Sequence, residues 1–183
     1  HFLSCVALFL HQRGRWRENE PLIKTALRLR RNVLGEKHPD TIQIMVPLAI
    51  TYRKQGRYSE AEEISVKLLD LSREVLGENH PNTDSSMAGL ATTYHAQGRY
   101  NKAEEICIKV LDLRREMLGE KHPDTIASMA SLATTYHAQG RYDEAGVISV
   151  RALILQQEVL GETHPGTISS MVDLATTYHA QGR

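Results

Sequence analysis

The sequence repeats itself with a period of 42 residues, and this period constrains the fold more than any other feature. The block LGEKHPDT at 34–41 returns as LGENHPNT at 76–83, LGEKHPDT at 118–125 and LGETHPGT at 160–167. A fixed period of this length is typical of stacked architectures, in which each repeat buries its apolar surface against its neighbours. We therefore predict one array over residues 1–183, made of a partial repeat (1–33), three whole repeats (34–75, 76–117 and 118–159) and a truncated repeat (160–183).

Each whole repeat contains two helical patterns. Met87, Leu90, Ala91 and Tyr94 have the i, i+3, i+4, i+7 spacing of one buried stripe, which predicts a first helix, helix A, over about 82–97. A second apolar stripe predicts helix B over about 100–117, and Gly98 ends helix A between them. Applied to every repeat, this pattern predicts an all-α chain of nine helices.

Two prolines fall inside predicted helices. Pro47 lies in the middle of helix A of repeat 34–75, where it removes a hydrogen bond at a cost of roughly 3 kcal/mol, so we expect a kink there. Pro21 either kinks the first helix B or marks a late start of that helix.

The pattern Leu90, Ala91, Tyr94, Gly98, Tyr100, Ala103 resembles the tetratricopeptide helix-turn-helix signature. The 42-residue period and the LGEKHPDT linker resemble the long repeats of kinesin light chains, and the arrays that follow the NTPase in fungal and bacterial NACHT or NB-ARC (STAND) proteins. This resemblance covers essentially the whole chain. It implies a right-handed α-solenoid of tetratricopeptide-like helix-turn-helix repeats that binds a protein or peptide on its concave face.

In such arrays helix A lines the concave face, so the residues opposite its core stripe are the candidate contacts. Most of them are small or hydroxylated, which would let a partner approach closely, and larger polar groups flank them. The candidate residues are Arg53, Ser85, Gly89, Thr92, His95, Ser131, Thr134, His137, Asp173, Thr176 and His179. The same face of the first whole repeat offers Gln43, Pro47, Ile50 and Lys54. The alternative is a solvent-facing surface that binds nothing.

One row of this face changes in every repeat: Pro47, Gly89, Ser131 and Asp173. Such variation is expected of either specificity tuning or drift. This row resembles the position at which kinesin light chains carry groove asparagines that hold a peptide backbone. No repeat here carries Asn at that position. This departure favours the sensor array of a STAND-type protein, with a kinesin-light-chain-like cargo adaptor as the alternative and a catalytic or metal-binding protein as the third hypothesis.

The composition disfavours several other functions. Lys and Arg number 22 and so do Asp and Glu, which leaves only local basic patches such as Arg28, Arg30 and Arg31, so we expect no nucleic-acid partner. The apolar run HFLSCVALFL at 1–10 is shorter than the about 20 residues that cross a bilayer, and we expect a buried helix instead of a membrane segment. Cys5 and Cys107 are too far apart in the repeat register for a disulfide, which implies reduced thiols and a cytoplasmic location. We expect Cys107 to pack in the core and Cys5 to lie on the variable row, where it could be exposed.

Histidines form two ladders with the repeat period, one in the linkers and one on helix A. The ladders are His38, His80, His122 and His164, then His95, His137 and His179. Neighbours in a ladder are about 10 Å apart or more, whereas Zn–N bonds are about 2 Å, so they cannot share a metal. We expect the linker histidines to cap helices. Neither HExxH nor CxxC occurs, and we predict no cofactor, no metal and no enzymatic activity.

The sequence starts without Met and stops at Arg183, directly before an expected helix B, which suggests a fragment of a longer protein. The last helix A would then leave Met171, Leu174 and Tyr178 uncovered. We expect self-association through this apolar face, which sedimentation at increasing concentration would test.

Overall fold

The computed structural model describes residues 16–182, and every regular element in this range is an α-helix. The chain divides into two compact units, His1–Gln97 and Gly98–Arg183. The first unit contains α2 (Trp16–Leu34), α3 (Pro39–Gln43), α4 (Met45–Lys54), α5 (Tyr58–Leu76) and α6 (Pro81–Ala96). The second contains α7 (Tyr100–Leu118), α8 (Pro123–Ala138), α9 (Tyr142–Leu160) and α10 (Pro165–Ala180). The predicted helices 82–97 and 100–117 correspond to α6 and α7 to within a residue at each end.

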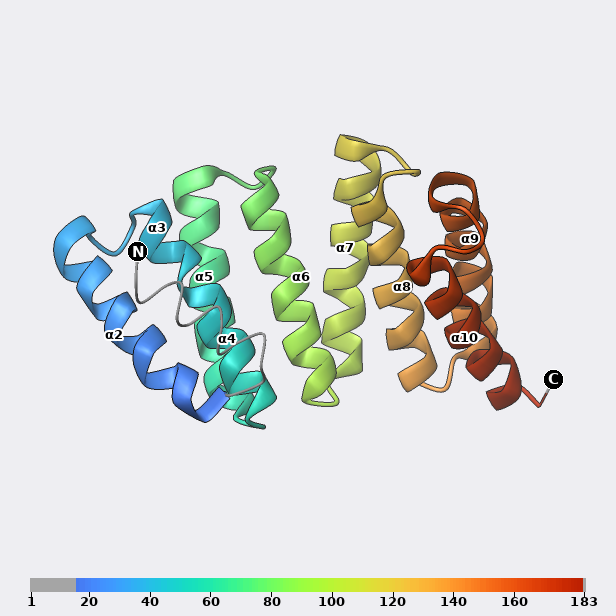
Figure 1. The fold of residues 1–183 in the computed structure, drawn as a ribbon, viewed down its shortest axis with the longest axis horizontal. Helices are drawn as coiled ribbons and strands as arrows, with labels where there is room; N and C mark the ends of the chain where they lie inside the picture. Colours follow the sequence, from blue (N-terminus) through green and yellow to red (C-terminus); the bar gives the residue numbers. More distant parts are fainter. Residues whose placement is uncertain (1–15, 183) are drawn as a thin grey trace. The chain divides into compact units, whose positions relative to one another are not determined.

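In the first unit, consecutive helices pack as antiparallel hairpins (Figure 1). Helix α4 lies against both α2 and α5, and α5 lies against α6. Ile23, Met45, Leu48, Ala61 and Leu68 form one buried cluster, and none of them is more than 5% exposed. The alanine lets the two helices of a hairpin approach closely, and the longer side chains fill the space beside it.

The second unit repeats this packing, with α7 against α8, α8 against α9, and α9 against α10. Its buried side chains include Ile126, Met129 and Leu132 on α8 and Ala145 and Leu155 on α9. Helix-turn-helix repeats therefore account for all of the described residues. The prediction of an all-α tetratricopeptide-type fold is confirmed.

The linker before each helix A both caps that helix and turns the chain. The Nδ1 atom of His122 accepts a hydrogen bond from the backbone N–H of Asp124 at 3.2 Å, and His80 does the same for Asn82 at 3.1 Å. These bonds satisfy one of the free N–H groups at each helix start. Gly119 ends the preceding helix with φ of 87°, a conformation that residues with a Cβ rarely adopt. The expected capping role of the linker histidines is what the structure shows.

Pro47 interrupts its helix as expected. The predicted helix A of repeat 34–75 is split into α3 and α4 at Ile44. The break lies where the carbonyl of Gln43 would have accepted the N–H that proline lacks. Pro21, in contrast, lies inside α2, which begins at Trp16 and continues without interruption to Leu34. The alternative of a late helix start at Pro21 is therefore wrong.

The described residues contain nine helical segments, but they are not the nine that were predicted. The break at Ile44 adds one segment, because α3 and α4 replace a single helix A. The expected first helix, the apolar run 1–10 and Cys5 lie outside the described residues. Cys107 is buried on α7, and burial raises the pKa of its thiol.

Candidate functional site

In each unit, the predicted contact residues lie on one side of the helices that begin the repeats, and we call this side of those helices the A-helix face. It comprises Arg53 on α4, Ser85, Gly89, Thr92 and His95 on α6, Ser131, Thr134 and His137 on α8, and Asp173, Thr176 and His179 on α10. Eight of these are exposed, as the helical periodicity predicts. Arg53, His95 and His137 are half-buried. The sequence therefore predicts correctly which side of each helix faces outward, whereas the half-burial of three long side chains depends on neighbouring helices.

Most hydroxyl groups on this face are bonded to their own helix. Thr92 and Thr134 donate to the carbonyls of Ala88 and Ala130, each at 2.9 Å. Ser131 donates to Ala127 at 3.1 Å, and Thr176 donates to Asp173 at 2.7 Å. Their protons are committed, so these hydroxyls offer a partner acceptor lone pairs and small, closely approachable surfaces. Donation to a partner would require breaking a hydrogen bond within the helix.

In the first unit, a cavity that we call the α4–α6 hollow lies between the first helix A and the next. Gln43, Pro47, Ile50 and Arg53 line one wall, and Ser85 and Gly89 of α6 line another. Its volume is about 760 Å³. Residues from the same predicted face of two repeats are thus brought together. Thr92 and His95 are not among its lining residues.

In the second unit, a much smaller groove lies between α8 and α10. Thr134 and His137 of α8 and Asp173 and Thr176 of α10 line it, and its volume is about 120 Å³. Ser131 and His179 do not line this groove. The His137 ring packs edge-to-face on Tyr142, with 5.1 Å between ring centroids, so the histidine also supports the α8–α9 hairpin.

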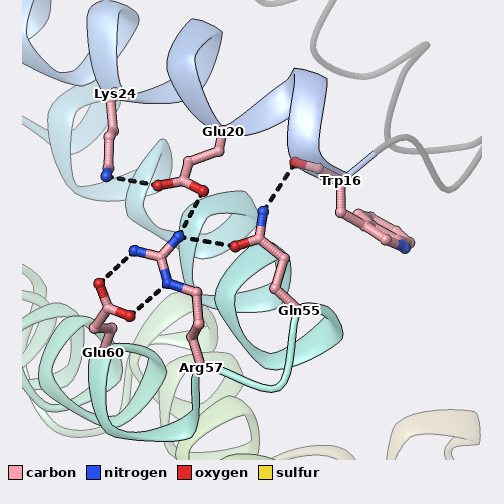
Figure 2. A network of polar contacts seen from close by, with 6 residues as sticks. All are labelled: Trp16, Glu20, Lys24, Gln55, Arg57 and Glu60. Atoms are coloured by element: carbon pink, nitrogen blue, oxygen red, sulfur yellow. Dashed lines mark hydrogen bonds and ion pairs between the residues drawn. The ribbon is translucent and has the colours of Figure 1, made fainter.

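A polar network that the sequence analysis missed joins the turn between α4 and α5 to α2 of the preceding repeat (Figure 2). Arg57 donates to Glu20 of α2 at 2.6 Å and pairs with Glu60 at the start of α5. Its guanidinium also stacks over the Tyr52 ring, 4.3 Å from the centroid. Gln55 donates to the carbonyl of Trp16 at 3.2 Å and accepts from Arg57 at 2.9 Å. One arginine therefore connects three helices.

The second unit contains the same network. Arg141 donates to Glu104 of α7 at 2.8 Å, pairs with Glu144 and stacks 4.1 Å from the centroid of the Tyr136 ring. Gln139 donates to the same Glu104 carboxylate at 2.7 Å. The signal in the sequence was the recurrent QGR triplet, with Glu20, Glu62 and Glu104 one period apart. One period after Glu104 the residue is Gly146, which has no carboxylate. In that repeat Gln181 donates to Asp143 instead, at 3.1 Å.

The Glu20 network predicts a pH dependence of stability. Burial raises the pKa of the Glu20 carboxyl, but hydrogen bonds from Lys24, Arg57 and Gln55 outweigh this effect and lower it from 4.5 to about 2. Because the pKa is lower in the folded state, the ionised carboxylate stabilises the fold above pH 4.5, and this contribution is lost as the pH falls towards 2. We expect the midpoint of urea unfolding to decrease over this interval.

The Glu20→Gln variant removes this titration and should lower stability at neutral pH while flattening the acid dependence. The matched control is Glu63→Gln, because Glu63 is an exposed carboxylate on α5. This variant should leave the acid dependence of stability unchanged. An equal change in the two variants would show that the acid dependence arises from overall charge and not from the Glu20–Arg57 network.

Residues 16–182 contain no group of three or more His, Cys, Asp or Glu side chains arranged to hold a metal ion. Within the same part of the chain, no helix is both long and apolar enough to cross a membrane. On α10, Met171 is 37% exposed, whereas Leu174 and Tyr178 are half-buried, so only part of the expected uncovered stripe is open to solvent.

Stacked helix hairpins, a buried alanine at each hairpin crossing and glycine-terminated turns together define a helical-repeat scaffold. The family model for the tetratricopeptide repeat matches residues 2–67, 45–106, 85–146 and 136–183. The chain belongs to the tetratricopeptide repeat family. No curated protein sequence matches it.

Several solved structures have a similar fold. One is the putative kinesin light chain of Podosopora anserina, described as having nearly identical TPR-like repeats. Its sequence is 27% identical to this chain, the TM-score is 0.84, and the match covers 98% of this chain and 85% of that one. BtubC (BKLC) from P. vanneervenii is 25% identical with a TM-score of 0.83, over 98% and 72% of the two chains. RapI in its apo form, at 16% identity and a TM-score of 0.74, shares the fold alone. The resemblance to kinesin-light-chain-like repeats is thus confirmed, and the NACHT or NB-ARC association remains a prediction.

Proposed function

We propose that this array is a non-enzymatic scaffold that binds a protein or peptide on its A-helix face. The observation that carries the proposal is that this face is exposed and built from small side chains in both units. Gly89 and Ser85 line the hollow in the first unit, and Thr134 and Thr176 line the groove in the second. A partner's backbone can approach such a surface closely, and extended grooved faces are the usual binding surfaces of repeat scaffolds.

The Thr134→Arg variant tests this proposal. Thr134 is exposed in the α8–α10 groove, and an arginine there would fill that groove with a bulky cation. Peptides selected from a displayed random library against the native chain should bind this variant at least about tenfold more weakly, as for loss of a central contact. The helical circular-dichroism signal should not change.

Val147→Arg is the matched control, because it adds the same charge to the second unit at a side chain that is 73% exposed on α9. We expect it to retain binding. Selected peptides that bind Thr134→Arg as well as the native chain would place the binding site away from the A-helix face.

For the biological context we propose the sensor array of a larger STAND-type protein. Two observations support this context. Repeats 76–117 and 118–159 are identical at 25 of 42 positions, as expected of a recent duplication, and no repeat carries asparagine on the variable row of Pro47, Gly89, Ser131 and Asp173. The similarity to the P. anserina putative kinesin light chain supports the second candidate, a cargo adaptor. Sequencing the full-length transcript separates them. A GxxxxGK motif followed by Ser or Thr upstream supports the sensor, and an upstream heptad coiled coil without that motif supports the adaptor.

A further inference from the structure

The α4–α6 hollow differs in kind from the corresponding groove of the second unit. Its volume of about 760 Å³ is several times the 120 Å³ between α8 and α10. It also falls within the range of about 300–1,000 Å³ that is typical of small-molecule sites. Five helical segments contribute to its walls, since Ile23 of α2, Gln43 of α3 and Leu68 of α5 line it together with residues of α4 and α6.

The enlarged volume coincides with the helix break. Gln43, Ile44 and Pro47, which surround the break between α3 and α4, all line the hollow. Ile44 is a further departure, because the other repeats have serine at its position (Ser86, Ser128 and Ser170). The break and this substitution make the first unit both more open and more apolar than the second.

Most polar groups that line the hollow are already bonded within the protein. Ser65 shares a hydrogen bond with Thr93 at 3.4 Å, and Ser72 shares one with Ser86 at 3.2 Å. Arg30 donates to the carbonyl of Asp40 at 2.6 Å. The surface left for a ligand is aliphatic, and the neutral side chains of Gln43, Asn82 and Ser85 are exposed.

Arg53 is the exception. Its side chain lines the hollow and is half-buried, and burial lowers the pKa of its guanidinium. Among residues 16–182, no carboxylate forms an ion pair or hydrogen bond with it, in contrast to Arg57 and Arg141. A partly desolvated cation beside aliphatic side chains favours an anionic partner, because a charge-assisted pair is stronger there than in water.

We propose that the α4–α6 hollow binds a small aliphatic carboxylic acid, with its alkyl chain against Ile42, Val46, Ile50 and Leu68 and its carboxylate on Arg53. An extended peptide is a poorer occupant of this hollow, because each of its residues brings a backbone N–H and C=O that require partners. Four of the five serines and threonines that line the hollow already share hydrogen bonds, Ser65 with Thr93 and Ser72 with Ser86. Arg53, Ser85 and Gly89 belong to the A-helix face, so this site overlaps that face in the first unit, whereas the peptide-binding test at Thr134 concerns the second unit.

Isothermal titration of the native chain with decanoate and with decan-1-ol tests the proposal. We expect decanoate to bind with one site per chain. The Arg53→Gln variant should weaken decanoate binding by about tenfold, the effect of losing one charged hydrogen-bonded pair, and should leave decan-1-ol binding as it is. Failure of decanoate to bind, or equal binding by the native chain and Arg53→Gln, would overturn the proposal.

A second pair of variants tests the location. Gly89 lies on the wall formed by α6, and no heavy atom is within 4 Å of the Cβ that a side chain would add, so Gly89→Leu adds a bulky side chain to this wall. We expect it to abolish binding of both ligands, because it occupies their space. Ser131→Leu, at the same repeat position on α8, should bind both as the native chain does. Equal loss of ligand binding in the two leucine variants would contradict a small-molecule site in the hollow. So would a random peptide that displaces decanoate from the native chain but not from Arg53→Gln.

Discussion

Replacing Met129 by alanine is expected to lower the free energy of unfolding by about 3 kcal/mol, within the range of about 2–5 kcal/mol for large-to-small changes in cores. Met129 is 1% exposed on α8, at a core position of the second unit. The loss combines the transfer free energy of the deleted atoms with the cavity left behind. Urea unfolding monitored by circular dichroism measures it.

The repeat supplies a matched control for this substitution. Met171 occupies the same repeat position on α10 but is 37% exposed. Because less of its surface is removed from water, Met171→Ala should cost about 1 kcal/mol or less. Equal losses in the two variants would show that burial at this repeat position does not determine its contribution to stability.

Replacing Pro47 by alanine is expected to join α3 and α4 into one helix and to raise the free energy of unfolding by about 2 kcal/mol, somewhat less than the full cost of an interior proline. Two buried hydroxyls of this repeat are also unsatisfied. The buried hydroxyls of Thr41 and Thr51 have no hydrogen-bond partner, whereas Thr125 donates to Gly119 at 2.8 Å and Thr135 donates to Ser131 at 2.9 Å at the same repeat positions.

Pro21→Ala is the control for this prediction. Both variants lose the entropic restriction that proline places on the unfolded chain, but α2 already continues through Pro21. The stability gain should therefore be clearly larger for Pro47→Ala, and backbone chemical shifts of residues 43–47 should become helical. Similar stabilities for the two variants would mean that packing around Ile44, and not the proline, causes the break.

The helical architecture could be predicted from local sequence because its determinants lie within one turn of each other. The spacing of Met87, Leu90 and Tyr94 defines a buried stripe, and Gly98 ends the helix, whatever the rest of the chain does. The kink at Pro47 followed from its missing N–H in the same way. Which residues of helix A face outward also follows from the 100° rotation per residue.

The details of the candidate site could not be predicted in this way. Arg53 and His95 occupy the same repeat position, yet only the structure places Arg53 in a hollow, because that placement depends on residues of α2, α5 and α6. The pair of Glu20 and Arg57 joins residues 37 apart in sequence, and no helical spacing relates them. The hydrogen bonds from Thr92 and Thr134 to carbonyls of their own helices depend on the side-chain rotamers, which the composition does not reveal.

The sequence by itself determined the repeat period, the helix boundaries and the outward face of each helix A, because all three depend on residue spacing along single helices. The tertiary structure alone decided where that face is hollow, that Arg53 in the hollow has no carboxylate partner among the described residues, and which hydroxyls are already bonded. The physical reason is that burial and pairing depend on distances between helices, and small changes such as Pro47 and Ile44 alter those distances without altering the periodicity.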